Sequence, residues 1–128
     1  MIALSIQQPW AWLIIKGEKL IENRYWPTRY SGHLAIHASK KFDEDGYRWV
    51  KENFPSLKMP KPTEFVTGAI IGIVHMTGCI DYSSTPDPRS ISPWFFGPYG
   101  FVFRDPVELE RPIPYRGMPG FFEVNING

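Results

Sequence analysis

Internal disulfide bonds are excluded from this chain, because its 128 residues include a single cysteine, Cys79. A lone thiol fits a reducing compartment such as the cytoplasm. No apolar run approaches the roughly 20 residues that a membrane-spanning helix needs. The first residues also lack the basic start and the cleavage site of a secretory signal. These absences predict a soluble, cytoplasmic protein with no membrane partner.

Strong charge of either sign is absent as well. The formal net charge of +1 excludes a protein that coats nucleic acid by overall basicity, so nucleic-acid binding must depend on a local patch. Hydrophobic residues make up 43% of the chain and aromatic residues 16%, which is ample for a core. The length suits one domain of ordinary size, and we expect residues 1–128 to form it.

Several chemical signatures are missing. The chain has neither a glycine-rich phosphate loop nor a Cys-x-x-Cys pair. His33 and His37 are spaced to meet on one face of a strand, but no nearby acid or cysteine completes the set of three or more ligands that zinc requires. Cys79 and His75 lie four positions apart on one expected strand, roughly 13 Å, which argues against a thiol–imidazole pair. We therefore expect no metal and no cofactor.

Hydrophobic patterns predict mostly strands. Apolar residues alternate with others over 2–6 and 33–39, and the longest strand signal covers 65–81. In that long strand, Ile70 and Met76 share their parity with three glycines, an arrangement that suits a strongly coiled sheet. Further strands are expected at 99–104, 107–110, 112–115 and 121–126.

Two short helices complete the pattern. Pro9 suits a first helical turn and Gly17 can end the helix, whose residues are apolar on nearly all sides, so it should be buried at one end of a barrel. Asp43 is a suitable N-cap for a second helix that ends at Asn53. The aromatic loop 82–98 should fold back over the body. The predicted class is α+β and β-rich, a small β-barrel of about six strands with one or two short helices.

Segment 17–26 concentrates the charge of the chain. In an extended strand Glu22, Arg24 and Trp26 face one side, with Lys19 just before them. An exposed strand with one ion pair, worth about 0–1 kcal/mol, explains this pattern without any function. A shared site for Lys19 and Glu22 needs a turn or bulge near Lys19, because positions three apart in a regular strand point in opposite directions.

Two successive motifs carry a resemblance. They are Leu-Ser-Ile-Gln-Gln-Pro-Trp-Ala over 4–11 and Gly-x-Lys-x-x-Glu-x-Arg over 17–24. Later stretches of the same kind are 36–39, 68–72, Trp94 with Gly97, and 112–120. Together they resemble the ASCH-domain family of the PUA-like superfamily. The resemblance implies a small β-barrel, a cleft beside the first helix, the charged strand and the aromatic loop, and an association with RNA.

The same resemblance raises the question of catalysis. Some members of the family are amidohydrolases that remove the acyl group of acetylcytidine, and others are described as ribonucleases. The amidohydrolases carry threonine at the position of Glu22, and they use a glutamate on the later long strand. This chain has no glutamate between Thr67 and Cys79. A threonine nucleophile activated by lysine therefore cannot be carried over.

Three functions stay open. The first is a module that binds single-stranded RNA or a modified nucleoside through cations, amides and stacking aromatic rings. The second is a hydrolase that uses Lys19 and Glu22 as catalytic residues, with a cation stabilising an oxyanion. The third is a protein-interaction adaptor that docks through the aromatic loop. The candidate binding residues are Gln8, Trp10, Arg24, Trp26, His37, Ser39, Lys40 and Trp94; the oligomeric state is left open.

Overall fold

The computed structural model describes residues 1–126. Its helices and strands follow in the order β1 (Ile2–Gln8), α1 (Trp10–Ile15), β2 (Ile21–Arg24), β3 (Gly32–Phe42), α2 (Glu44–Asn53), β4 (Ala69–Asp81), α3 (Pro88–Ile91), β5 (Tyr99–Pro114) and β6 (Phe121–Glu123). Single 3-10 turns lie at Pro62–Glu64 and Tyr82–Ser84. Within these residues, no helix is long and apolar enough to cross a bilayer.

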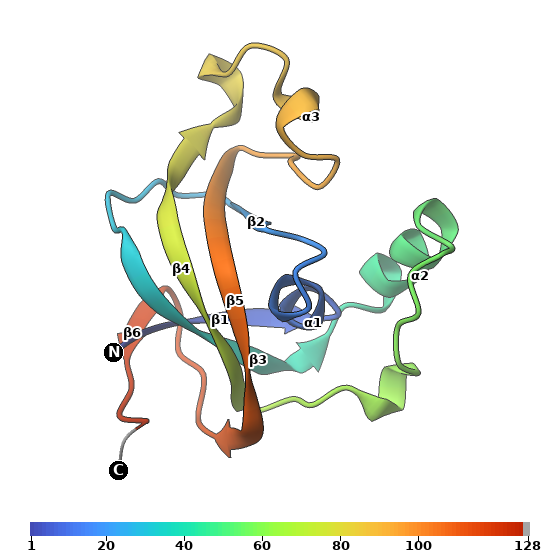
Figure 1. Cartoon of the computed structure of the whole chain (residues 1–128), viewed down its shortest axis with the longest axis vertical. Coiled ribbons are helices and arrows are strands. Elements are labelled where there is room, and N and C mark those ends of the chain that lie inside the picture. Colours follow the sequence, from blue (N-terminus) through green and yellow to red (C-terminus); the bar gives the residue numbers. More distant parts are fainter. Residues whose placement is uncertain (127–128) are drawn as a thin grey trace.

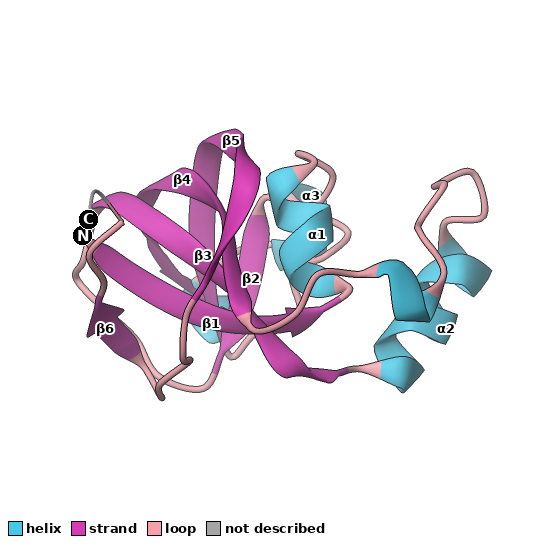
Figure 2. Ribbon diagram, turned by 90° about the horizontal axis from the view of Figure 1, so that it is seen from below, coloured by secondary structure: helices cyan, strands magenta, loops and turns pink. Residues whose placement is uncertain are grey.

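All six strands belong to one sheet, in the order β2-β5-β4-β3-β1-β6 (Figure 1). The sheet curls around a core of fully buried side chains that includes Leu4, Ile36, Met76 and Phe101. Helix α1 lies at one end of the curled sheet, with α2 beyond it (Figure 2). The predicted α+β class and the barrel-like sheet are confirmed, and α3 adds a third short helix.

The two edge strands, β2 and β6, are not hydrogen-bonded to each other. Side chains close this seam instead. Trp26, just after β2, packs edge-on against Phe121 of β6 at a centroid distance of 5.3 Å and against Phe101 at 5.1 Å. Arg24 reaches across from β2 and donates a hydrogen bond of 2.8 Å to the backbone oxygen of Ser5 in β1. The sheet is therefore barrel-like without a closed ladder of backbone hydrogen bonds.

Two strand predictions need correction. Register shifts in the pairing of β4 with β5 break the single parity expected for the long strand, so Ile70 packs outside the curled sheet while Met76 packs inside it. The pieces expected at 107–110 and 112–115 belong to one continuous strand, β5. That strand passes a bulge at Asp105, whose φ is +52°, and so continues beyond Pro106.

The end of α1 sets up the region that follows. Gly17 has φ +80°, its N–H donates to the oxygen of Ile14, and the N–H of Glu18 donates to the oxygen of Leu13. This pair of bonds is a Schellman motif, which ends a helix with a left-handed glycine. The N–H of Lys19 also donates to the oxygen of Leu13. Lys19 is thus held in a turn ahead of β2, as a shared site with Glu22 requires.

Gly17→Ala should lower the free energy of unfolding by about 1–2 kcal/mol, because a residue with a Cβ is strained in the left-handed region. Space is not the issue, since the nearest atom to such a Cβ would be Cγ of Pro106 at 3.8 Å. Gly17→Asn is the matched control and should lose less, because asparagine tolerates this conformation. Urea denaturation measures both. Equal stability of the alanine variant and the parent would show that the turn does not depend on glycine.

Candidate functional site

A buried ion network occupies the start of β2. Lys19 is 3% exposed, and its Nζ donates hydrogen bonds to Oε1 of Glu22 (3.0 Å) and to the backbone oxygen of Ile21 (2.5 Å). The ammonium lies 5.6 Å from the ring centroid of Trp10. Nε of Arg24 lies 3.3 Å from the other oxygen of Glu22, as an ion pair whose direction is too poor for a hydrogen bond. Both oxygens of Glu22 therefore face a cation.

An open pocket of about 540 Å³ lies beside this network. We call it the aromatic pocket. Its aromatic lining comes from three segments, with Trp10 in α1, Trp49 in α2, and Trp94 and Phe96 in the loop before β5. The other lining residues are Lys19, Glu22, Asn23, Asp43, Asp45 and Gly46. Of the residues predicted for a site, the structure brings Trp10, Lys19, Glu22 and Trp94 together here.

Neighbouring groups fix the rings of the aromatic pocket. The indole N–H of Trp10 donates to Oδ2 of Asp43 at 2.9 Å. The ring of Phe54 stacks on that of Trp94 with centroids 4.3 Å apart and an interplanar angle of 19°. Trp49 meets the rings of Trp94 and Phe96 edge-on at 6.1 and 5.6 Å. Contacts within the protein therefore hold the walls of the pocket.

Asn23 attaches the aromatic loop to β2. Its Nδ2 donates to the oxygen of Trp94 (3.0 Å), and its Oδ1 accepts from the N–H groups of Phe96 (2.9 Å) and Gly97 (3.0 Å). This role was not predicted, because an isolated asparagine gives no sequence signal for it. Trp49 was not predicted either, although a signal for it exists. That tryptophan stands outside the apolar stripe of Tyr47, Val50 and Phe54 on an amphipathic helix.

Gln8 and Trp26 do not line the aromatic pocket. Gln8 is 1% exposed, its Nε2 donates to the oxygen of Val66, and its Oε1 accepts from the N–H of Trp12. Both ends of the amide are thus already bonded within the protein. The ring of Trp26 packs in the seam of the sheet, as described above. Arg24 does not line the pocket either, and it is connected to the lining through its ion pair with Glu22.

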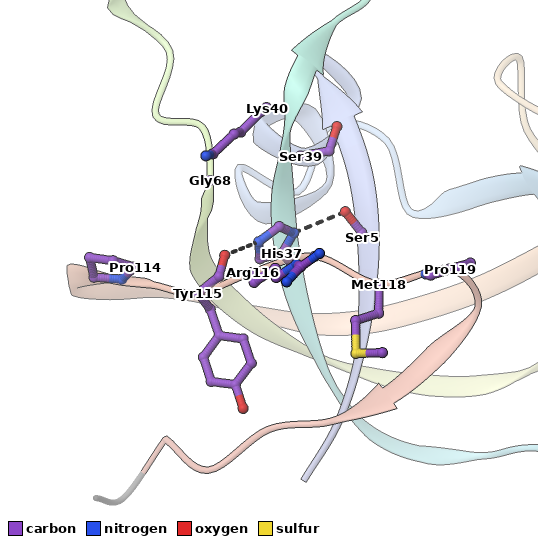
Figure 3. Close-up of a pocket in the computed structure, with 11 residues that line it drawn as sticks. Ser5, His37, Ser39, Lys40, Gly68, Pro114, Tyr115, Arg116, Met118 and Pro119 are labelled. Atoms are coloured by element: carbon purple, nitrogen blue, oxygen red, sulfur yellow. Dashed lines mark hydrogen bonds between the residues drawn. The ribbon is translucent and has the colours of Figure 1, made fainter.

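His37, Ser39 and Lys40 line a different cavity, of about 760 Å³, on the outer face of β1 and β3 (Figure 3). His37 is 1% exposed and lies between Ser5 and the backbone oxygen of Tyr115. A carbonyl oxygen can only accept, so Nε2, at 2.7 Å from it, carries the proton. In the neutral ring Nδ1 then accepts from the hydroxyl of Ser5 at 2.9 Å.

The two hollows differ in charge. Three carboxylates line the aromatic pocket, from Glu22, Asp43 and Asp45, against one ammonium, that of Lys19. The cavity at His37 is lined by Lys40 and Arg116 and by no carboxylate of the described residues. Residues 1–126 contain no group of three or more side chains placed to hold a metal ion. His33 and His75 form only a pair, with ring centroids 5.5 Å apart.

The ion network should couple Lys19 and Glu22 in stability. Lys19→Met should lower the free energy of unfolding by about 3 kcal/mol, because it leaves a largely buried carboxylate with one cation instead of two. Glu22→Gln should also destabilise. The double variant should lose clearly less than the sum of the two, as urea denaturation of all four proteins would measure. Additive losses would show that the two charges do not depend on each other.

The fold and the turn at Lys19 define a class of protein. A curled six-stranded sheet with a short helix after its first strand is a PUA-like fold. The ASCH protein of Zymomonas mobilis has this fold, with a TM-score of 0.58 at 14% identity over 98% of this chain and 87% of that chain. A single-residue variant of it gives 0.57 at 14% identity, over 98% and 88%. At this identity the likeness shows the fold alone.

The family follows from the sequence. A sequence model described as the ASCH domain matches residues 4–97, and the chain belongs to the ASCH domain family. Human Activating signal cointegrator 1 is 27% identical over 127 residues, which cover 95% of this chain and 22% of that protein. The mouse protein of the same name is 26% identical over 129 residues, with the same coverage. The chain thus spans about a fifth of the length of these relatives.

Proposed function

We propose that this ASCH domain binds an unstacked base of single-stranded RNA, or a free modified nucleoside, in the aromatic pocket. The observation that carries the proposal is the set of aromatic rings, Trp10, Trp49, Trp94 and Phe96, around an open pocket of about 540 Å³. Stacking of a base on such rings contributes about 1–3 kcal/mol. The volume lies in the range of small-molecule sites, roughly 300–1,000 Å³.

The charge of the pocket narrows the ligand. Lys19, the cation of the lining, is already paired with Glu22, so the pocket offers phosphate no free cation, and we expect the base to be the part of a nucleotide that enters. Asp45 lies at the start of α2 in the lining; its Oδ1 is paired with Arg48, and its other oxygen can accept from an exocyclic amino group. Cytosine, adenine and guanine carry such a group and uracil does not. We therefore expect cytidine to bind more tightly than uridine.

The buried network supports binding in preference to hydrolysis. A general base must be free to take a proton from the ligand within hydrogen-bond reach. Lys19 is 3% exposed, and its ammonium is hydrogen-bonded to Glu22 and to the backbone oxygen of Ile21. Glu22 is held between two cations. In this arrangement the pair fixes the turn and the floor of the pocket.

Removing one ring wall tests the proposal. Trp49→Ala and Phe96→Ala should each weaken the binding of cytidine and of a short single-stranded RNA by roughly 5- to 150-fold, the loss of one stacking contact. Calorimetric titration measures the dissociation constants. Tyr25→Ala is the matched control, because this aromatic side chain is 89% exposed and lies outside the pocket. Equal affinity of the Trp49 variant and the parent protein would refute stacking in this pocket.

Mass spectrometry of the ligands settles the catalytic alternative. Acetylcytidine and RNA should remain intact after incubation with the parent protein. Deacetylated or cleaved product that disappears with Glu22→Gln would instead establish a hydrolase that depends on this carboxylate. Unfolding curves of the variant, recorded alongside, separate lost turnover from a lost fold.

A further inference from the structure

The cavity at His37 has a character of its own. It lies on the outer face of β1 and β3, beneath residues 114–119, which run from the last residue of β5 towards β6 (Figure 3). Ser5 and His37 form its buried polar floor through the hydrogen bond described above. Lys40 and Arg116 contribute two cations to its lining. We call this hollow the basic cavity.

The cations of the basic cavity are not neutralised within the described chain. Neither Lys40 nor Arg116 belongs to any of the ion pairs formed among residues 1–126. By contrast, the buried cations Lys19 and Arg24 share Glu22. Two cations that line one concave surface without a carboxylate raise the local potential and attract an anion.

Glycines build the walls of the basic cavity. A Cβ at Gly117 would lie 2.8 Å from Cε1 of His37 and 3.0 Å from Oγ of Ser5, so only glycine lets the covering segment approach the polar floor. A Cβ at Gly68, whose φ is +68°, would lie 3.3 Å from Cε of Lys40. The stem of Lys40 therefore lies along the backbone at Gly68, which limits where its ammonium can go.

The covering segment is itself anchored. Nε2 of His37 donates to the backbone oxygen of Tyr115, the residue before Arg116. The ring of His37 also packs edge-on against that of Phe122 in β6, with centroids 6.0 Å apart. Arg116 therefore starts from a fixed backbone position. A guanidinium presented in this way suits the tetrahedral oxygens of a phosphate, which it can bind through two N–H groups.

We propose that the basic cavity binds a phosphate group, held by charge-assisted hydrogen bonds from Lys40 and Arg116. Two sources share this chemistry: the backbone of a nucleic acid and a free phosphomonoester. The site is separate from the aromatic pocket and does not require it. Its volume of about 760 Å³ leaves room for the group that carries the phosphate.

Inorganic phosphate is the first probe, titrated into the whole chain and followed by calorimetry and by the NMR signals of the His37 ring. Lys40→Ala and Arg116→Ala should each weaken binding about tenfold or more, as the loss of one charge-assisted hydrogen bond predicts. Lys41→Ala is the matched control, because this neighbouring lysine is exposed and lies outside the cavity lining. An equal effect of all three substitutions, or no binding by the parent protein, would overturn the proposal.

Further probes separate the source of the phosphate and the two sites. The first of these probes is an RNA that lacks terminal phosphates. If the protein binds it, and if Lys40→Ala or Arg116→Ala reduces the slope of log affinity against log salt concentration by about 0.7, the cavity binds the nucleic-acid backbone. Binding of cytidine 5′-monophosphate and inorganic phosphate without that RNA assigns it to a phosphomonoester. Cytidine bound without any phosphate effect would overturn this proposal and leave the aromatic pocket intact. Phosphate bound without cytidine would support this proposal and refute base binding in the aromatic pocket.

Discussion

The carboxylate of Glu22 is the group on which both cations at the seam of the sheet depend. Burying an ammonium or a guanidinium without a counter-charge is costly, and the two side chains concerned, Lys19 and Arg24, share this one anion. Lys19 belongs to the turn that follows Gly17, and Arg24 is hydrogen-bonded to the backbone oxygen of Ser5. One carboxylate therefore links α1, β2 and β1 at the place where the sheet has no backbone hydrogen bonds to close it.

The alternation of side chains along β2 transmits this constraint to the aromatic pocket. Glu22 and Arg24 lie on the face that meets the ion network, while Ile21 and Asn23 lie on the other. Ile21 is buried against Trp94 and Phe95, and Asn23 holds the same loop through three hydrogen bonds. A strand of four residues thus fixes the floor of the pocket with one face and its aromatic loop with the other.

The sequence contained much of this arrangement, because its strongest signals are local. Pro9 stands just before α1 and Gly17 just after it, and Asp43 caps α2 by accepting from the N–H of Gly46. The motifs that resemble the ASCH family predict the fold. The alternation of side chains does not predict bulges. One extra residue in β4 moves Ile70 to the face of the sheet opposite to the one that alternation predicts. Lys19 and Glu22 could be expected near each other because they are close in the chain, and the ion pair joins them.

Residues from distant elements were harder to group. Trp26 and Trp94 cannot be told apart by residue type, yet the first packs in the seam and the second lines the aromatic pocket. The curl of the sheet decides which of the two rings contacts Phe121. His37 and Lys40 were binding candidates alongside Trp10 and Trp94, whereas the structure places them in a different cavity, on the outer face of β3. A single sequence gives the periodicity of a strand but not which of its two faces the sheet curls around.

This division of residues between two hollows bears on how an RNA ligand would be read. Contacts to phosphate position a nucleic acid and supply affinity, whereas contacts to a base supply specificity. The aromatic pocket has rings that suit a base and a lysine that is already paired, whereas the basic cavity has Lys40 and Arg116, which suit phosphate in our proposal. Arg24 stands between them, paired with Glu22 of one lining and bonded to Ser5 of the other. Because its guanidinium is already held by Glu22 and by the backbone of Ser5, it could fix the spacing of the two proposed sites without taking part in either.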